Sequence, residues 1–347
     1  MRPVRAMSAI SGLPRIALDL SGPHEPLGNW MALLADALIT EELCEVVRFR
    51  TENDGSRTPD ITVGSPALWR PWWYRSMGRR IDRYLTDVDV VHVAGRATPR
   101  CGSIPMLISV DDLRPLRDDA KDRQRVAQLL RAVRHGARIV ATSRSASIEV
   151  QRSLKLGREE VTVVSPAVAW DQPVTMGTNL VVNLAGQTDA FLSLAPELVQ
   201  LAHEQHARVV VLASQAATSR IRQRNLDVDI RSRRDASDVL MNARAVVHLS
   251  DGARFPSFTI AALAAGVPTC ATPTSVNREL LEGAAVLMNL DDAGAFVESV
   301  KEIVVNDSRR AVLIAAGRHR ASDFAPSVAA RSFAELYSDT TRRVVRA

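Results

Sequence analysis

Short apolar runs alternate along the chain with longer stretches that have the spacing of amphipathic helices. The runs are rich in Val, Ile and Leu and fall into two series. They cover residues 15–20, 88–93, 106–110, 138–142 and 161–164 in the first half, and residues 180–185, 208–213, 245–249 and 267–271 in the second half. Apolar runs that are separated by helices are typical of buried strands in βαβ units, so the pattern predicts parallel sheets.

The two series divide the chain into halves of similar size. Residues 15–172 are expected to form one domain and residues 179–325 another, with a linker at residues 173–178 and a disordered leader at residues 1–14. The predicted fold class is α/β, with two doubly wound Rossmann-like domains that face each other across a cleft. Because ligands bind such sheets outside the carboxyl ends of the strands, the cleft is the expected location of the site.

The composition is that of an ordinary globular protein. With 347 residues, of which 46% are hydrophobic and 24% charged, the chain is long enough for two domains that each have a core. No apolar run approaches the roughly 18–20 residues needed to cross a bilayer, which argues against a membrane-spanning helix. Residues 6–13 are too polar for the apolar core of a signal peptide, so we expect a cytoplasmic protein.

The chain is basic, and almost all of its positive charge is carried by arginine. Lysine and arginine together number 44, against 39 aspartate and glutamate residues, which gives a net charge of +5. The planar arginine side chain suits phosphate, although a GC-rich genome would produce the same bias. The arginine-rich run at residues 220–234 is interleaved with aspartate, so a charged surface loop explains it better than nucleic-acid binding. Nucleic acid is therefore not an expected partner.

No residue pattern predicts a metal or redox site. Cys44, Cys101 and Cys270 are too far apart in the sequence to form a CxxC motif. His203 and His206 lie on a predicted helix, but their spacing is one residue short of HExxH and no further ligand is close in the sequence. We therefore expect no bound metal.

The most informative stretch runs from a strand end at Ser250 through a loop to a predicted helix that begins near Ser257. A helix N-terminus presents free backbone N–H groups and the positive end of its dipole, so this turn could hold a diphosphate. A βαβ unit without a ligand would have the same pattern, and composition does not decide between the two. Arg254 lies within the loop and could supply positive charge there, whereas a solvated surface arginine is the simpler interpretation.

This stretch resembles the donor-binding half of the retaining glycosyltransferases of family 4, which have the GT-B fold. The family pattern reads roughly S-x-x-E-G-F-G-x-P-x-x-E-A-M-A-x-G-x-P-V. The residues in register with it and with the P-E-V element that follows are Ser250, Phe255, Ala262, Ala264, Gly266, Pro268 and Glu279. In the first half, residues 87–92, 104–116 and 136–150 are similar to further family elements, and Gly28 falls at the glycine of the first loop. The resemblance covers about residues 15–340.

The resemblance implies transfer of a hexose, mannose-like or other, from a nucleoside diphosphate sugar to a glycan or lipid-linked acceptor. Residues 15–172 would bind the acceptor and residues 179–325 the donor, and a final helix at residues 326–347 would cross back to the N-terminal domain. It implies no metal or other cofactor, because a helix dipole and basic side chains neutralise the diphosphate. The implied donor-binding residues are Gly28, Gly186, Ser250, Arg254, Phe255, Ser257, Phe258, Thr259 and Glu279.

Several polar residues of the family pattern are missing. The paired glutamates, which are expected to contact the donor sugar and the ribose, fall on Ala253 and Ala261. The histidine of a His-Asp pair falls on Asp111, which leaves Asp111 and Asp112 as the candidate catalytic residues. The basic pair expected near residues 187–190 is also absent. In a site without water, each hydrogen-bond donor that points at the developing charge stabilises the transition state by on the order of 3–4 kcal/mol. A second hypothesis therefore stays open, in which the chain is a catalytically degenerate GT-B protein that acts as a binding or regulatory partner.

Residues 68–83 gather three of the five tryptophans beside five arginines. Tryptophan and arginine favour membrane interfaces, so this segment could make peripheral contact with an anionic membrane, on its inner face. An aromatic cluster that caps the first core is an equal alternative.

Overall fold

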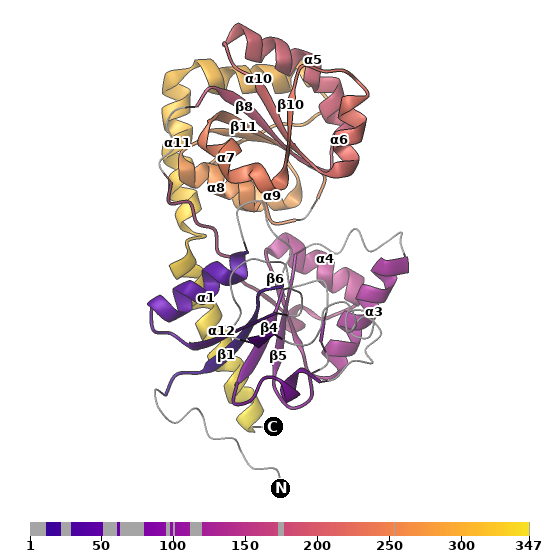
Figure 1. Ribbon diagram of the computed structural model, residues 1–347, viewed down its shortest axis with the longest axis vertical. Helices are drawn as coiled ribbons and strands as arrows, with labels where there is room; N and C mark the ends of the chain where they lie inside the picture. The colour runs from indigo at the N-terminus through magenta and orange to yellow at the C-terminus, as the bar shows by residue number, and fades with distance from the viewer. Residues whose placement is uncertain are drawn as a thin grey trace. The chain divides into compact units, whose positions relative to one another are not determined.

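The computed structural model describes residues 12–21, 29–50, 61–62, 80–94, 98–99, 101–111, 120–172, 177–252 and 254–346. The chain forms two compact units (Figure 1). The first contains Asn29–Ala167 with the strand that precedes it and Pro326–Ala347, and the second contains Val168–Ala325. Each unit has its own parallel sheet with helices on both faces, so the predicted α/β class with two doubly wound Rossmann-like domains is confirmed.

The described part of the first unit contains a seven-stranded parallel sheet with the order β3-β2-β1-β4-β5-β6-β7. The strands are β1 (Arg15–Asp19), β2 (Glu45–Arg50), β3 (Ile61–Thr62), β4 (Val90–Val93), β5 (Met106–Val110), β6 (Arg138–Ala141) and β7 (Val161–Val163). The central strands β4 and β5 are buried at every position, as their continuous apolar sequences predict for strands that are covered on both faces.

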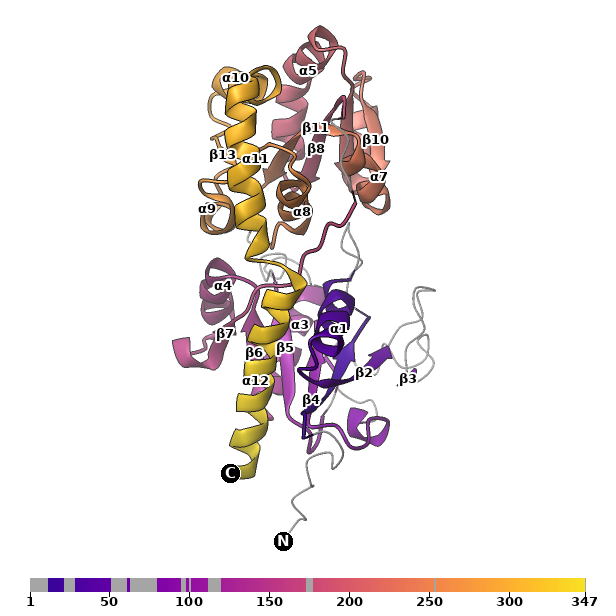
Figure 2. The same ribbon diagram turned by 90° about the vertical axis from the view of Figure 1, so that its left-hand side faces the viewer.

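Helices cover both faces of this first sheet. They are α1 (Trp30–Thr40), α3 (Ala120–Arg134), α4 (Arg144–Leu154) and α12 (Pro326–Arg346), with the 3₁₀ turns η1 (Ile81–Arg83) and η3 (Arg158–Glu160). The apolar residues of α1 and α12 pack on one face, and those of α3 and α4 pack on the other. Helix α12 runs beside α1 and is the last described element of this unit (Figure 2).

Side-chain caps fix where the helices of the first unit begin. The Asn29 side chain accepts a hydrogen bond from the Met31 N–H (3.0 Å), and the Ser143 hydroxyl accepts one from the Ala146 N–H (3.0 Å). Both residues are preferred N-caps because their side chains satisfy amides of the first helical turn. At α12 the first helical position is Pro326, where a missing N–H costs nothing.

The second unit contains a six-stranded parallel sheet, within the described residues, with the order β10-β9-β8-β11-β12-β13. The strands are β8 (Asn179–Ala185), β9 (Val209–Ala213), β10 (Asp229–Ser232), β11 (Ala243–Ser250), β12 (Thr269–Ala271) and β13 (Val286–Leu287). In chain order this arrangement is 3-2-1-4-5-6, the order of dinucleotide-binding sheets, and its order reverses between β8 and β11.

Two layers of helices cover the second sheet. The elements are α5 (Thr188–Glu204), α6 (Gln215–Arg222), η4 (Arg233–Asp235), α7 (Ala236–Met241), α8 (Ser257–Ala265), α9 (Ser275–Leu281), α10 (Ala293–Val305) and α11 (Asp307–Ser322). Residues of α7, α8 and α9 form the core of one face, and residues of α5, α6 and α10 form the core of the other. Residues 220–234, predicted as a surface loop, instead include the end of α6, strand β10 and turn η4.

Among the described helices, none is both long enough and apolar enough to cross a membrane.

Candidate functional site

The carboxyl ends of β8 and β11 form the point at which the order of the second sheet reverses. Strands β8 and β11 pair in parallel up to Ala185 opposite Ser250, and Gly186 forms one further bridge with Ser250. Ligands of doubly wound sheets bind outside the strand ends at such a point. Two of the predicted site residues, Gly186 and Ser250, are therefore at the edge where a ligand is expected.

Gly186 is held in a backbone conformation that strongly favours glycine. Its φ angle is +128°, which L-residues rarely adopt. A Cβ atom at this position would also overlap the carboxylate of Asp251, whose exposed side chain would have to move. The turn from β8 into α5 therefore favours glycine at residue 186, chiefly because of its φ angle.

Ser250 fastens the loop that follows β11 to the end of β12. The Ser250 N–H donates to the Thr272 hydroxyl oxygen (3.0 Å), and the Thr272 hydroxyl donates to the Ser250 carbonyl (2.7 Å). The Ser250 hydroxyl accepts from the Gly252 N–H (3.3 Å), and the Asn277 side chain donates to the Thr272 carbonyl (2.8 Å). All these polar groups are buried, so the start of the loop has a defined position.

Helix α8 begins at Ser257 without a side-chain cap. Its N-cap is Pro256, and its first turn contains no acidic residue. The first amides of a helix have no partners within the helix, so this turn carries the positive end of the dipole. Such a turn at a sheet switch point can hold an anionic group such as a phosphate.

The predicted donor-binding residues of this loop and helix differ in what they expose. Arg254 is exposed and Ser257 is half-buried, so both side chains lie at the surface of the unit. Phe255, Phe258 and Thr259 are buried. Of the three, Phe258 and Thr259 belong to the first turn of α8, and their burial leaves Ser257 as the residue of this turn that reaches the surface.

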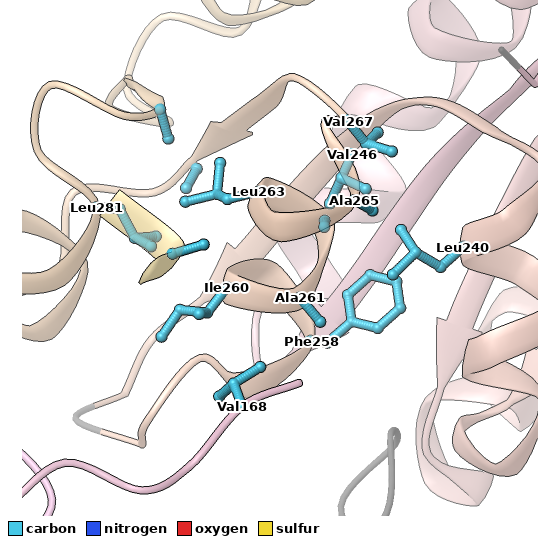
Figure 3. Close-up of a cluster of buried hydrophobic side chains, with 14 of the residues drawn as sticks. Val168, Leu240, Val246, Phe258, Ile260, Ala261, Leu263, Ala265, Val267 and Leu281 are labelled. Carbon is cyan, nitrogen blue, oxygen red and sulfur yellow. The ribbon is translucent and has the colours of Figure 1, made fainter. Parts of the chain in front are cut away.

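Ala261 is completely buried in the apolar core around α8. Figure 3 shows it beside the ring of Phe258, with Leu240 beyond that ring. A carboxylate at this position would be removed from water without a charged partner in the cluster, which is strongly unfavourable. The core of this unit therefore occupies the position at which the family pattern has its second glutamate.

The remaining predicted site residues do not all belong to this site. The Glu279 carbonyl in α9 accepts a hydrogen bond from Arg320 Nη2 (2.9 Å). Asp111 follows β5 in the first unit, where its Oδ1 accepts a hydrogen bond from the Thr142 hydroxyl (3.0 Å). Gly28, Asp112 and Ala253, as well as most of the tryptophan- and arginine-rich segment, lie outside the described residues.

A buried polar pair on β8 and β11 was not predicted from the sequence. Asn183 and His248 face each other across the two strands, and the Asn183 amide nitrogen lies 3.0 Å from His248 Nδ1. Burial, and to a smaller degree the charge of Arg233, lowers the pKa of His248 to about 4. His248 is therefore neutral at pH 7. The signal in the sequence was a single polar residue inside each apolar run.

Arg233 brings a positive charge to the same strand ends. It belongs to η4, directly after β10, and its Nη2 atom donates to the Leu184 carbonyl near the end of β8 (2.9 Å). Arginine can donate to several acceptors at once, so a guanidinium held here can also serve an anionic ligand. The basic pair that the family pattern places after β8 is absent, and Arg233 is a candidate to replace part of its charge.

Among the described residues, no group of three or more His, Cys, Asp or Glu side chains is arranged to hold a metal ion.

No protein-family model matches the chain, and no curated protein matches it in sequence. Solved structures do match. Sucrose-phosphate synthase from Thermosynechococcus elongatus is 15% identical with a TM-score of 0.65, covering 94% of this chain and 98% of that one. HepE from Anabaena in complex with UDP and glucose is 13% identical with a TM-score of 0.68, covering 94% and 100%. WaaG, a glycosyltransferase involved in lipopolysaccharide biosynthesis, is 13% identical with a TM-score of 0.64, covering 93% and 99%.

At identities this low, the similarity establishes the fold alone. The chain has the two-domain GT-B fold of these glycosyltransferase structures.

Proposed function

We propose that the chain is a metal-independent glycosyltransferase that transfers a hexose from a nucleoside diphosphate sugar to a glycan or lipid-linked acceptor. The observation that carries this proposal is the uncapped N-terminus of α8, which follows β11 at the switch point of a 3-2-1-4-5-6 sheet. HepE, which shares the fold, has been solved with UDP-glucose.

In this proposal the second unit holds the nucleotide part of the donor. The positive end of the α8 dipole and the side chains of Arg254 and Ser257 attract the diphosphate, while Gly186 lets the backbone approach it closely. Arg233, fixed to the end of β8, adds positive charge. As the bond between the sugar and the diphosphate breaks, the leaving phosphate gains negative charge, and donors already aimed at it stabilise that charge.

The acceptor side of the reaction belongs to the first unit in this proposal. A new bond forms between the anomeric carbon and an acceptor oxygen, and the acceptor hydroxyl passes its proton to a base in the site. Asp111, which follows β5, and Asp112, the next residue in the sequence, are the candidate catalytic residues. We place the protein in the cytoplasm, with peripheral membrane contact through residues 68–83.

A second candidate function is favoured by the burial of Ala261. Apolar core fills the position of a ribose-binding carboxylate, and an alanine stands at the other glutamate position as well. A chain with these changes could bind a nucleotide or a protein partner without turnover. In that case it would act as a regulatory partner of an active transferase.

The two candidates are separated by measuring binding and turnover on the same sample. Nucleotide affinity is measured by calorimetry, and release of UDP, GDP or ADP from the sugar donors is followed with candidate acceptors. The transferase requires both binding and release, whereas the binding partner requires a ligand or partner complex without release. The double variant Arg254→Ala with Ser257→Ala should bind the nucleotide more weakly, while the control Arg222→Ala, an exposed arginine of α6, should not.

A further inference from the structure

The first and last residues of the second unit lie at or next to a backbone hydrogen bond that joins the two ends of the unit. The chain enters this unit at Val168 and leaves it after Ala325. The Val168 N–H donates a hydrogen bond to the Phe324 carbonyl (2.9 Å). The carbonyl of Phe324 therefore binds the residue at which the chain enters the unit. Phe324 also lies only two residues before Pro326, the first residue after the chain has left the unit.

The side chain of Phe324 contacts the loop of the candidate site. Its ring packs edge-to-face on the ring of Phe255, with centroids 5.7 Å apart and an angle of 72° between the rings. Both rings are buried, with 4% and 5% of their surface exposed. Phe255 belongs to the loop between Ser250 and Ser257. Phe324 therefore contacts this loop with its ring and Val168 with its carbonyl.

Arg320 holds Phe324 from a further side. Its guanidinium carbon lies 5.1 Å from the centroid of the Phe324 ring. The same guanidinium donates to the carbonyls of Leu280 and Glu279 (2.9 Å each) and to Asp323 (2.7 Å). The Phe324 ring is therefore enclosed between the loop and the end of α9, where close packing leaves it little freedom to move independently of Phe255.

We propose that Phe324 is a positioning residue that couples the loop at residues 250–257 to the two segments through which the chain leaves the second unit. Occupation of the loop by a nucleoside diphosphate restrains the fluctuations of Phe255, and through Phe324 it reduces opening of the Val168–Phe324 hydrogen bond. The identity of the ligand rests on the proposed function, whereas the coupling does not.

The first test is hydrogen exchange of the Val168 amide in the full-length protein without ligand. Phe255→Leu should accelerate this exchange about five- to tenfold, although the amide is bonded to Phe324 and not to Phe255. Phe324→Leu should do the same, and the double variant should add little to either change, because both substitutions remove one contact. Should Phe255→Leu fail to fold, Phe255→Met removes the ring contact with less loss of volume.

Phe296→Leu is the matched control, because Phe296 is a fully buried ring in the core of the opposite face of the sheet. It should lower global stability without a selective effect at Val168. An acceleration at Val168 that is equal in Phe296→Leu and Phe255→Leu would overturn the coupling, and so would additive effects of Phe255→Leu and Phe324→Leu.

The second test adds UDP. Wild-type protein should show slower exchange at Val168 with UDP, and Phe324→Leu, which lies outside the predicted donor-binding residues, should lose this protection while still binding UDP. Binding of UDP with no protection at Val168 would overturn the inference and leave the proposed function intact. If UDP, GDP and ADP all fail to bind, the proposed function fails, and the comparison of ligand-free variants still decides whether the coupling exists.

Discussion

His92 Nδ1 lies 2.7 Å from the Tyr337 hydroxyl, and this hydrogen bond joins central strand β4 to the C-terminal helix α12. On the other side of the ring, Nε2 lies 2.8 Å from the Ser109 hydroxyl. A hydroxyl can both donate and accept, so the neutral imidazole is satisfied in either tautomer. Burial lowers the pKa of His92 to about 3 and raises the pKa of Tyr337. The last helix of the chain is thus fixed to the first sheet by an uncharged polar network inside an apolar core.

The stability of the fold should fall as the pH drops from 6.5 toward 4. His92 and His248 have folded-state pKa values of about 3 and about 4, below the ordinary value near 6.5, so the unfolded chain binds protons first. The free energy of unfolding is therefore unaffected by these two histidines well above pH 6.5. At pH 5 each histidine should have lowered it by on the order of 1–2 kcal/mol. Urea unfolding at pH 7 and pH 5 measures this loss.

His92→Gln serves as the control for that prediction, since glutamine keeps a polar side chain but does not titrate. The variant should lose less stability than the wild type between pH 7 and pH 5. Equal losses in the two proteins would show that His92 is not kept neutral by the fold.

Removal of the Tyr337 hydroxyl should destabilise the first unit. Tyr337→Phe keeps the ring, which stacks on Phe333 with centroids 6.0 Å apart, but leaves one nitrogen of buried His92 without a partner. The expected cost is about 1–3 kcal/mol in the free energy of unfolding at pH 7. Unchanged unfolding of Tyr337→Phe would contradict the role given to this hydrogen bond.

Gly186→Ala should disturb the candidate site more than a comparable change elsewhere. The new residue has to adopt φ +128° and displace the Asp251 side chain. Gly283 also has a positive φ, of +76°, but a Cβ atom there has nothing within 4 Å. We expect Gly186→Ala to cost at least about 1–3 kcal/mol and to weaken nucleotide binding, and Gly283→Ala to cost less and leave binding unchanged. Calorimetry with UDP and thermal unfolding compare the two, and equal effects would refute the prediction.

Introducing the missing glutamate should not create a better donor site. Ala261→Glu places a carboxylate in a fully buried apolar position and should cost about 3 kcal/mol or more, with no gain in nucleotide affinity. Ala261→Val tests overpacking of the same position without a charge. A stable Ala261→Glu protein that binds UDP more tightly than the wild type would show that this position faces the ligand after all.

Continuous apolar runs were sufficient to predict the central strands but not a strand that contains several charged residues. Val90–Val93 and Ala243–Ser250 lie in the middle of the sheets and read as apolar over most of their length. Strand β2 was missed because Glu45, Arg48 and Arg50 interrupt its pattern. In the fold Arg48 is neutralised by Asp36, whose carboxylate lies 2.7 Å away, and a partner 12 positions away is not visible in local periodicity.

The candidate site could be predicted in part: its residues at strand ends were predicted, whereas contacts that depend on register and packing were not. The family resemblance predicted Gly186 and Ser250 as donor-binding residues, and the structure brings them together at the ends of the adjacent strands β8 and β11. The pairing of Asn183 with His248 depends on the register between β8 and β11, which sequence spacing does not define. The sequence also identified Ala261 as a lost contact, but only packing shows that core side chains have closed around it.

The most direct test of the central claim is a calorimetric titration of the full-length protein with UDP, GDP, ADP and their common sugar conjugates. We predict saturable binding of one nucleotide and its sugar conjugate, weakened in the double variant Arg254→Ala with Ser257→Ala and retained in Arg222→Ala. A ligand at about 100 times its Kd should also stabilise the fold by roughly 2.7 kcal/mol. Absence of binding by every nucleotide at millimolar concentration, or binding that the double variant leaves unchanged, would contradict a donor site at the N-terminus of α8.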